Sequence, residues 1–273
     1  MSASQPALSL IKSLAYMDGR WCEARGGRRF EVLNPATGQL ITQVPDMDEA
    51  DTRLAIAAAH RAQPAWAALT AKERSSKLYA WFERIMANQE ELARIMTCEQ
   101  GKPLAEAKGE VAYGASFIQW FAEEGKRAYG RTIPGFSADR RLATIKQPVG
   151  VVAAITPWNF PIAMITRKVA PALAAGCTSV VKPAEATPLC ALALAELAMR
   201  AGIPAGVLNV VTTARPSVVG EVLTSSPIVR KLSFTGSTAV GKRLMAQCAP
   251  TVKRLSLELG GNAPFIVFND ADL

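Results

Sequence analysis

Lys182 and Glu185 are the first two residues whose chemistry suggests a ligand. They belong to the segment VVKPAE at 180–185, which runs from the end of an expected strand into the loop after it. An ammonium group donates hydrogen bonds and a carboxylate accepts them, so this pair could hold the hydroxyl groups of a ribose. A carboxylate in that place would repel a ribose 2′-phosphate, which favours NAD over NADP. A solvated Lys–Glu ion pair explains the same two residues equally well.

A second possible ligand site is the segment FTGSTAVG at 234–241. Gly236 permits a tight turn between a strand and a helix, and the free N–H groups at the start of that helix could bind a pyrophosphate. The segment does not have the GxGxxG pattern. A plain strand-to-helix turn is therefore an equally good interpretation.

Asn159 and Glu258 could take part in catalysis. Asn159 lies in the loop TPWNFP at 156–161, where two prolines fix the chain and a neutral amide donor could stabilise an oxyanion. Glu258 lies in LELGG at 257–261 between apolar neighbours, and a desolvated carboxylate is a stronger base. Taken alone, each residue has a simpler interpretation: an Asn that caps a loop, and a Glu exposed on a strand.

These segments follow an alternation of strands and helices that begins at Gly150. The pattern predicts strands at 151–155, 178–182, 207–211 and 230–234, and helices at 162–175, 188–201, 217–224 and about 238–248. Strands that are continuously apolar and β-branched indicate a parallel sheet with helices on both faces and right-handed crossovers. We therefore predict a doubly wound α/β dinucleotide-binding fold, whose ligand lies beyond the carboxyl ends of the strands.

An amino-terminal helical layer precedes this sheet. Short strands are expected at 15–21 and 30–34, and three helices are expected to begin at capping boxes, formed by Asp46 with Glu49, Thr70 with Glu73, and Asn88 with Glu91. A fourth helix is expected at 104–129. Residues 130–148 are polar, rich in Arg and bracketed by Gly and Pro, which predicts a projecting β-hairpin. Near the end, a strand is expected at 265–268, followed by a helix cap at Asn269 and Asp270.

Composition excludes several classes of protein. The net charge is +8, but the basic residues are dispersed and form no zinc-finger or RNP pattern, so nucleic-acid binding is not expected. No apolar run approaches the roughly 20 residues that span a membrane, and no secretory or transit signal is evident. The single histidine, His60, excludes a Ser-His-Asp triad within the chain. The positive charge would attract an anionic cofactor and substrate.

The five cysteines are scattered and have no CxxC spacing. They are Cys22, Cys98, Cys177, Cys190 and Cys248. This pattern argues against a disulfide framework or a metal site and fits a reducing cytoplasmic location.

Together and in order, the four segments resemble the PWNFP, KPAE, FTGST and LELGG motifs of the aldehyde dehydrogenase superfamily. The resemblance runs from MDGRW at 17–21 to NDADL at 269–273. The blocks AKERS at 71–75, EQGKPL at 99–104, MITRK at 164–168 and GNAPFIVF at 261–268 are most similar to succinate-semialdehyde dehydrogenases. So many matches in one order favour the functional interpretation of each motif.

The resemblance implies a cofactor, NAD with NADP as a possibility, and a residue set that binds it. That set is Thr156 and Trp158 in the cofactor cleft, Lys182 and Glu185 at the adenosine ribose, Gly236 and Ser237 at the pyrophosphate, Val240 beside the adenine, and Leu259 near the nicotinamide.

The resemblance also assigns catalytic and substrate-binding roles. Asn159 would donate to the developing oxyanion, and Glu258 would activate the water that releases the product. Arg167 would bind the far carboxylate of a semialdehyde, which suits a guanidinium because it can grip a carboxylate with two hydrogen bonds. A charge on a helix surface is the alternative for Arg167.

The resemblance divides the chain into an NAD-binding domain at 1–129 and 149–257, an oligomerisation hairpin at 130–148, and the start of a catalytic domain at 258–273. A homo-oligomer is therefore expected for the whole protein. The family's thiol nucleophile lies in a GQxC-like motif a few tens of residues beyond LELGG, and no cysteine here lies in such a motif. A single helical turn is also a poor end for a domain, so we expect a truncated chain that is inactive alone.

The expected reaction of the whole protein is NAD-dependent oxidation of succinate semialdehyde to the carboxylic acid through a cysteine thioester. Glutarate semialdehyde is the neighbouring candidate substrate. For the chain as it stands, a non-catalytic dinucleotide-binding fragment is the alternative.

Overall fold

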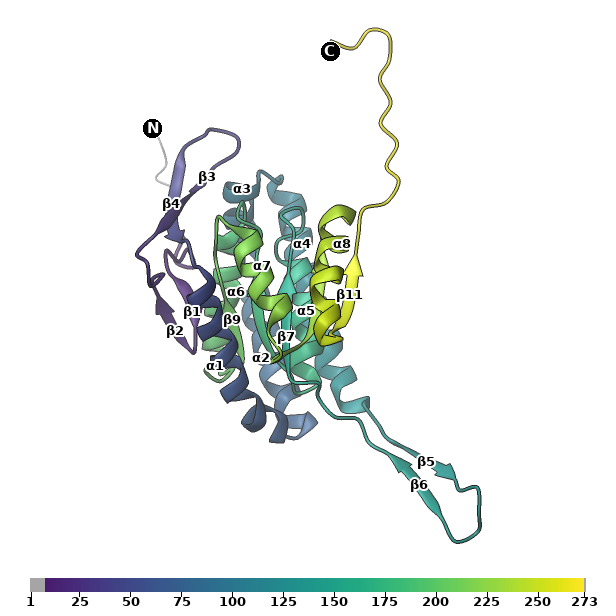
Figure 1. The fold of residues 1–273 in the computed structure, drawn as a ribbon. Coiled ribbons are helices and arrows are strands. Elements are labelled where there is room, and N and C mark those ends of the chain that lie inside the picture. Colours follow the sequence, from purple (N-terminus) through teal and green to yellow (C-terminus); the bar gives the residue numbers. More distant parts are fainter. Residues whose placement is uncertain (1–7, 273) are drawn as a thin grey trace.

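A seven-stranded sheet forms the centre of the computed structural model, which describes residues 8–272 (Figure 1). Its strand order is β11-β10-β7-β8-β9-β1-β2. The parallel strands are β7 (Val151–Ile155), β8 (Thr178–Lys182), β9 (Leu208–Val210), β10 (Val229–Thr235) and β11 (Arg254–Glu258). The antiparallel strands β1 (Ala15–Met17) and β2 (Arg20–Cys22) extend one edge. The expected α/β fold with a parallel sheet is confirmed.

Two expectations fall partly outside the described residues. Residues 1–7 belong to the leader in which no targeting signal was found, and Leu273 belongs to the expected final helical turn.

The burial of each strand follows its position in the sheet. Every residue of β7 and of β8 is buried, because helices cover both faces of the sheet at its centre. On β10 and β11 the burial alternates with a period of two. Leu232 and Phe234 face a core that includes Leu244, while Ser256 and Glu258 point to the opposite face. These strands therefore present polar side chains to only one side.

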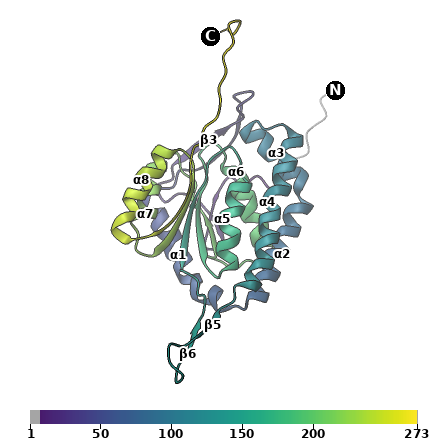
Figure 2. The same ribbon diagram turned by 90° about the vertical axis from the view of Figure 1, so that its right-hand side faces the viewer.

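Helices form a layer on each face of the sheet (Figure 2). One face carries α5 (Ala163–Ala174) and α6 (Pro188–Arg200), with α2 (Ala71–Ala87), α3 (Gln89–Gln100) and α4 (Leu104–Glu124) packed outside them. The other face carries α1 (Glu49–Ala68), α7 (Pro216–Ser225) and α8 (Thr238–Cys248). Buried Trp81 joins α2 to α6, since its Nε1 donates to the carbonyl of Leu194 at 3.1 Å.

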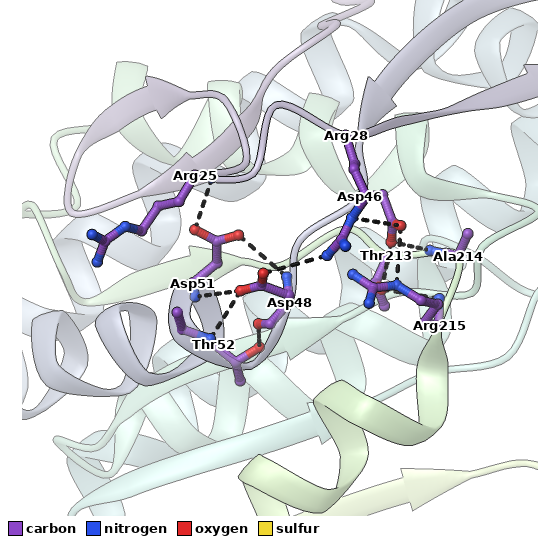
Figure 3. Close-up of polar contacts among 10 residues, drawn as sticks. Arg25, Arg28, Asp46, Asp48, Asp51, Thr52, Thr213, Ala214 and Arg215 are labelled. Carbon is purple, nitrogen blue, oxygen red and sulfur yellow. Dashed lines mark hydrogen bonds and ion pairs between the residues drawn. The ribbon is translucent and has the colours of Figure 1, made fainter.

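Only one of the three expected capping boxes forms as predicted. Thr70 and Glu73 cap α2 reciprocally. At α1 the box is instead Asp48 with Asp51, and Asp46 serves a different purpose (Figure 3). The carboxylate of Asp46 accepts hydrogen bonds from Thr213 Oγ1 and Ala214 N, each at 3.0 Å, and tethers the chain before α1 to the loop before α7.

The third box is absent because its two side chains have other partners. Asn88 precedes α3 without a side-chain cap, and its amide donates to the carbonyl of Arg84 at 2.7 Å. Glu91 accepts from the backbone N–H of Leu10 at 2.7 Å. Tertiary partners thus replace the local ones that the sequence suggested.

The amino-terminal strands also differ from expectation. The expected strand at 15–21 is the hairpin of β1 and β2, which turns at Asp18 and Gly19 with positive φ angles of 53° and 74°. A Cβ at Gly19 would lie 2.7 Å from the Cβ of Ala205, so only Gly fits there. The expected strand at 30–34 is β3 (Arg29–Leu33), which pairs with the unforeseen β4 (Leu40–Pro45).

The projecting hairpin is confirmed. It consists of β5 (Arg131–Pro134) and β6 (Arg141–Thr144), and it extends away from the body of the molecule (Figure 1). The expected helix at 104–129 ends as α4 at Glu124 and continues as a short 3₁₀ turn, η1 (Gly125–Arg127).

Two predictions about the carboxyl-terminal end are wrong. The strand expected at 265–268 does not form, because no strand among the described residues pairs with it, and Phe265 is 91% exposed. Asn269 and Asp270 form a turn and start no helix within the described range. The strand β11 (Arg254–Glu258), for which no range was predicted, follows a second 3₁₀ turn, η2 (Ala249–Thr251), and ends at Glu258, as the simpler interpretation of that residue implied.

Within residues 8–272, no helix has the length and apolar character to cross a membrane.

Candidate active site

The carboxyl ends of four neighbouring strands place the candidate residues in one row. Glu258 of β11 is opposite Thr235 of β10, and Lys182 of β8 is opposite Ile155 of β7. Phe234 of β10 is in turn opposite Ile155 and joins the two pairs. All these strands end at the same edge of the sheet, which is where a doubly wound fold binds its ligand.

Lys182 and Glu185 lie together at the β8 end of the row. Lys182 Nζ is 3.1 Å from Glu185 Oε2. Burial lowers the pKa of Lys182, and the charge of Glu185 opposes this shift. Burial would raise the pKa of Glu185, but the charge of Lys182 and a backbone hydrogen bond outweigh it, and the pKa is lowered. The carboxylate is half exposed, so it can still accept hydrogen bonds from a ligand.

The start of α8 has the features of a pyrophosphate site. Ser237 is the N-cap, and its hydroxyl accepts from the N–H of Val240 at 3.3 Å. A Cβ at Gly236 would lie 2.5 Å from the Phe234 ring, and one at Gly241 would lie 2.4 Å from Leu259. Only glycine fits at these two positions, and residues 237–240 at the start of α8 are exposed, so N–H groups at this helix start are accessible to an anion.

Polar and apolar groups suited to a nucleotide surround this turn. Thr156 is buried, and its Oγ1 has no hydrogen-bond partner among the described residues. Trp158 and Val240 are large apolar residues that are 59% and 44% exposed. An orphaned hydroxyl, an open helix N-terminus and exposed apolar side chains at one edge fit a dinucleotide with ribose, phosphate and aromatic base parts.

Hydrogen bonds from neighbouring side chains fix the loop that carries Asn159. Lys102 Nζ donates to the backbone carbonyl of Asn159 at 2.9 Å, and Gln100 Nε2 does so at 3.4 Å. The Asn159 side-chain oxygen accepts from the N–H of Phe160 at 3.0 Å. Because the amide oxygen is engaged with the backbone, the Nδ2 hydrogens are the groups that Asn159 can offer to a ligand.

A buried carboxylate supports the same loop. Glu110 of α4 accepts from the N–H groups of Ile162 and Ala163 at 3.0 and 3.3 Å, and it forms an ion pair with Lys102. Glu110 thereby satisfies the free N–H groups at the start of α5. Sequence reasoning missed this residue, although an acid next to Val111 on the apolar stripe of a helix was a usable signal.

Arg167 and Glu258 are brought together at the β11 end of the row. Arg167 Nη2 lies 2.8 Å from Glu258 Oε1, and the two side chains are 31% and 48% exposed. The guanidinium also lies over the Phe117 ring, 5.5 Å from its centroid. The apolar, desolvated setting expected for Glu258 is therefore wrong for this structure, because β11 is an edge strand and turns Glu258 toward solvent and Arg167.

A cavity of about 450 Å³ adjoins this ion pair beneath α5. Its lining includes Arg167, Lys168, Lys231, Ser256 and Glu258. Lys168 is buried, and its Nζ donates to Thr235 Oγ1 at 2.5 Å. Burial lowers the pKa of Lys168 to about 8, although the charge of Glu258 raises it. Sequence reasoning gave Lys168 no role, because an isolated Lys in a helix resembles any surface charge.

The cysteines lie apart from the row. Cys177 precedes β8 at the amino edge of the sheet, opposite the edge that carries Glu258. Burial raises the pKa of Cys22, Cys98 and Cys248, and raises that of Cys190 well above its usual value. Cys177 is buried at the amino edge of the sheet and also lines the cavity that Arg167 and Glu258 line, but none of the five cysteines lies in the row of candidate residues.

Known proteins resemble the chain closely. It is 66% identical over 264 residues to glutarate-semialdehyde dehydrogenase of Pseudomonas putida, covering 97% of this chain and 55% of that protein. It is 64% identical over 265 residues to the NADP-dependent succinate-semialdehyde dehydrogenase of Escherichia coli, with coverage of 97% and 55%. The chain thus spans about half the length of these relatives.

The fold comparison gives the same result. The crystal structure of succinate-semialdehyde dehydrogenase from Burkholderia pseudomallei is 61% identical and superposes with a TM-score of 0.93, covering 99% of this chain and 56% of that one. The sequence model described as "Aldehyde dehydrogenase family" matches residues 21–273. With this match and the motifs ordered along one edge of the sheet, the chain belongs to the aldehyde dehydrogenase family.

Proposed function

We propose that the whole protein containing this chain oxidises a semialdehyde to the carboxylic acid, with NAD as the hydride acceptor. Succinate semialdehyde is the favoured substrate, and glutarate semialdehyde is the neighbouring candidate. The observation that carries the proposal is the position of Arg167, which lies beside Glu258 at the carboxyl edge of the sheet. A cation there can hold the far carboxylate of a substrate whose aldehyde reacts nearby.

The cofactor residues follow the row described above. Lys182 and Glu185 would hold the hydroxyl groups of the adenosine ribose. The backbone at Gly236 and Ser237 would bind the pyrophosphate, and Val240 would lie against the adenine. When bound, the cofactor supplies the hydride acceptor.

The nicotinamide half of the cofactor would lie closer to the substrate. Thr156, Trp158 and Leu259 would surround it. The NADP-dependent relative is the competing precedent for the cofactor, and Glu185 is the reason for preferring NAD here.

The remaining residues would act on the substrate. Asn159 would donate an amide hydrogen to the oxygen that gains negative charge, because its loop is fixed by Lys102 and its amide oxygen is already engaged. Glu258 would accept a proton from the water that releases the acid. The thiol nucleophile is not assigned to any of the five cysteines of this chain.

Substitution of Arg167 tests the proposed substrate class. In the whole protein, Arg167→Ala should lower kcat/KM for succinate semialdehyde by about ten- to a hundredfold, because a charge-assisted contact to a carboxylate contributes about 1.5–3 kcal/mol. The value for butanal, which has similar length but no carboxylate, should change little. Arg94→Ala on the surface of α3 is the matched control. Equal losses for both aldehydes would reject the assignment.

A further inference from the structure

We propose that the Arg167–Glu258 ion pair couples binding of the substrate's carboxylate to release of the catalytic base. The inference rests on the proposed function, in which Arg167 binds that carboxylate and Glu258 activates water. With no substrate bound, the 2.8 Å contact between Arg167 Nη2 and Glu258 Oε1 occupies one of the two oxygen atoms that would accept the proton. The guanidinium carries a single positive charge and two carboxylates beside it repel each other, so binding of one weakens its hold on the other.

The surroundings of Arg167 allow it to change partners while staying in place. The centroid of the Phe117 ring lies 5.5 Å from the guanidinium, and the ring packs edge-to-face against Tyr113, with ring centroids 4.8 Å apart. A planar guanidinium on an aromatic face keeps that contact while its N–H groups turn from one acceptor to another. Phe117 is therefore a positioning residue for the exchange.

The charges around the cavity favour an incoming carboxylate. Lys168 of α5 and Lys231 of β10 line it together with Arg167, and Glu258 of β11 is the one carboxylate in its lining. With three cations and one anion, the cavity carries a net positive charge, which attracts a second carboxylate.

The exchange makes and breaks no covalent bond, since one carboxylate replaces another at the guanidinium. The exchange would also affect which aldehydes the enzyme selects. An aldehyde that carries a carboxylate frees Glu258 when it binds, whereas an uncharged aldehyde leaves Glu258 held by Arg167. Selection for semialdehydes would then act on the water-activation step as well as on binding.

The test measures competition between the two carboxylates in the 273-residue chain. Butyrate is the probe, because it presents the carboxylate end of the substrate without an aldehyde, and butyramide is its uncharged counterpart. Nuclear magnetic resonance of carbon-13-labelled glutamate carboxyl groups follows Glu258, whose signal is identified by its loss in Glu258→Gln. Saturation transfer to butyrate gives its Kd independently.

Butyrate should move the Glu258 signal in a saturable way, and butyramide should not. Glu258→Gln should bind butyrate about threefold more tightly, the effect expected from removing a partly exposed competing ion pair. Arg167→Gln should abolish the saturable response. Glu90→Gln, which removes a carboxylate paired with Arg94 elsewhere on the surface, should bind as the unaltered chain does. Thermal unfolding of each variant confirms that it is folded.

Four results would overturn the inference, and they separate it from the proposed function. If butyrate binds but the Glu258 signal stays still, or if Glu258→Gln binds no more tightly, the coupling is wrong while Arg167 can still bind the carboxylate. If binding survives in Arg167→Gln, both the coupling and the role of Arg167 are wrong. If no variant binds butyrate, the coupling is wrong and the kinetics of Arg167→Ala decide the proposed function.

Discussion

Glu185 stands where the choice between the two nicotinamide cofactors would be made. Its half-exposed carboxylate is held by Lys182 at the carboxyl end of β8 and would face a ribose 2′-position. In binding titrations we expect NAD to bind about tenfold or more tightly than NADP, because a 2′-phosphate would be placed beside a like charge. Glu185→Gln should reduce the preference, and Glu90→Gln should not. Tighter binding of NADP by the unaltered chain would contradict the argument.

Glu110 is the residue whose loss should disturb the Asn159 loop most. Its carboxylate is buried against Lys102 and the start of α5, so Glu110→Ala leaves a buried ammonium without its partner. We expect the free energy of unfolding to fall by about 3–5 kcal/mol, as for other broken buried ion pairs. Urea unfolding measures it. Glu90→Ala, which breaks exposed pairs, should cost about 1 kcal/mol or less. Similar costs for the two variants would show that burial of the Lys102 pair is energetically unimportant.

At the scale of elements, two buried glutamates join the outer helices to the inner ones. Glu110 of α4 accepts from the first N–H groups of α5, and Glu99 of α3 accepts from those of α6, Leu189 N and Cys190 N, each at 2.7 Å. Each carboxylate replaces the side-chain cap that its partner helix lacks. The outer helices thus help to fix the positions of α5 and α6, the two helices that cover this face of the sheet.

The Glu99 contact predicts a pH dependence of stability. Burial raises the pKa of Glu99 to about 7, and the hydrogen bonds from Cys190 and Leu189 only partly offset this. Because the folded state binds the proton more tightly than the unfolded state, this group's contribution to stability is full below the unfolded pKa. It is lost as the pH rises through about 7.

Urea unfolding at several pH values checks this prediction. The free energy of unfolding of the unaltered chain should fall between pH about 4.5 and about 7 relative to Glu99→Gln, which carries no titrating group at this position. The Glu91→Gln variant of the same helix is the control and should keep the decline. Parallel curves for the unaltered chain and Glu99→Gln would show that Glu99 titrates normally.

At the scale of the whole molecule, the β5–β6 hairpin projects from the body of the described residues 8–272, and every residue of its two strands is exposed. Ile133 and Leu142 face each other across it and are both exposed. We propose that the hairpin mediates subunit association in the whole protein. Ile133→Asp with Leu142→Asp should shift sedimentation toward the monomer, because exposed apolar side chains on a projecting ribbon are typical of an interface. Thr132→Asp with Ala143→Asp adds the same charge to the opposite face and should have less effect.

The chain alone should show no aldehyde dehydrogenase turnover. Burial disfavours the thiolate of Cys22, Cys98, Cys190 and Cys248. Cys177 lines the same cavity as Glu258, but it is buried and lies at the amino edge of the sheet. Without a nucleophile, Asn159 and Glu258 have no covalent intermediate to stabilise or hydrolyse, and catalysis should be orders of magnitude lower. The purified chain is mixed with NAD and succinate semialdehyde, and NADH formation is followed. Turnover that is lost when one cysteine is changed to Ser would place the nucleophile within this chain.

The sequence alone determined the elements whose signals are local. β7, β8 and α8 have the predicted bounds, because continuous β-branched runs and a strand-to-helix turn with Ser237 as cap specify them without long-range partners. The order of the motifs along such strands was enough to indicate the family and the edge of the sheet where the candidate residues meet.

Only the tertiary structure decided the contacts whose partners are far apart in sequence. Asp46 and Glu91 were expected to act locally at helix starts, yet they bind Ala214 and Leu10, because a short-range pattern carries no information about distant donors. β4 and β11 exist through pairing with β3 and β10, whereas 265–268 has the composition of a strand and remains unpaired. The pairing of Arg167 with Glu258 likewise depends on where α5 packs against an edge strand, which no spacing in the sequence records.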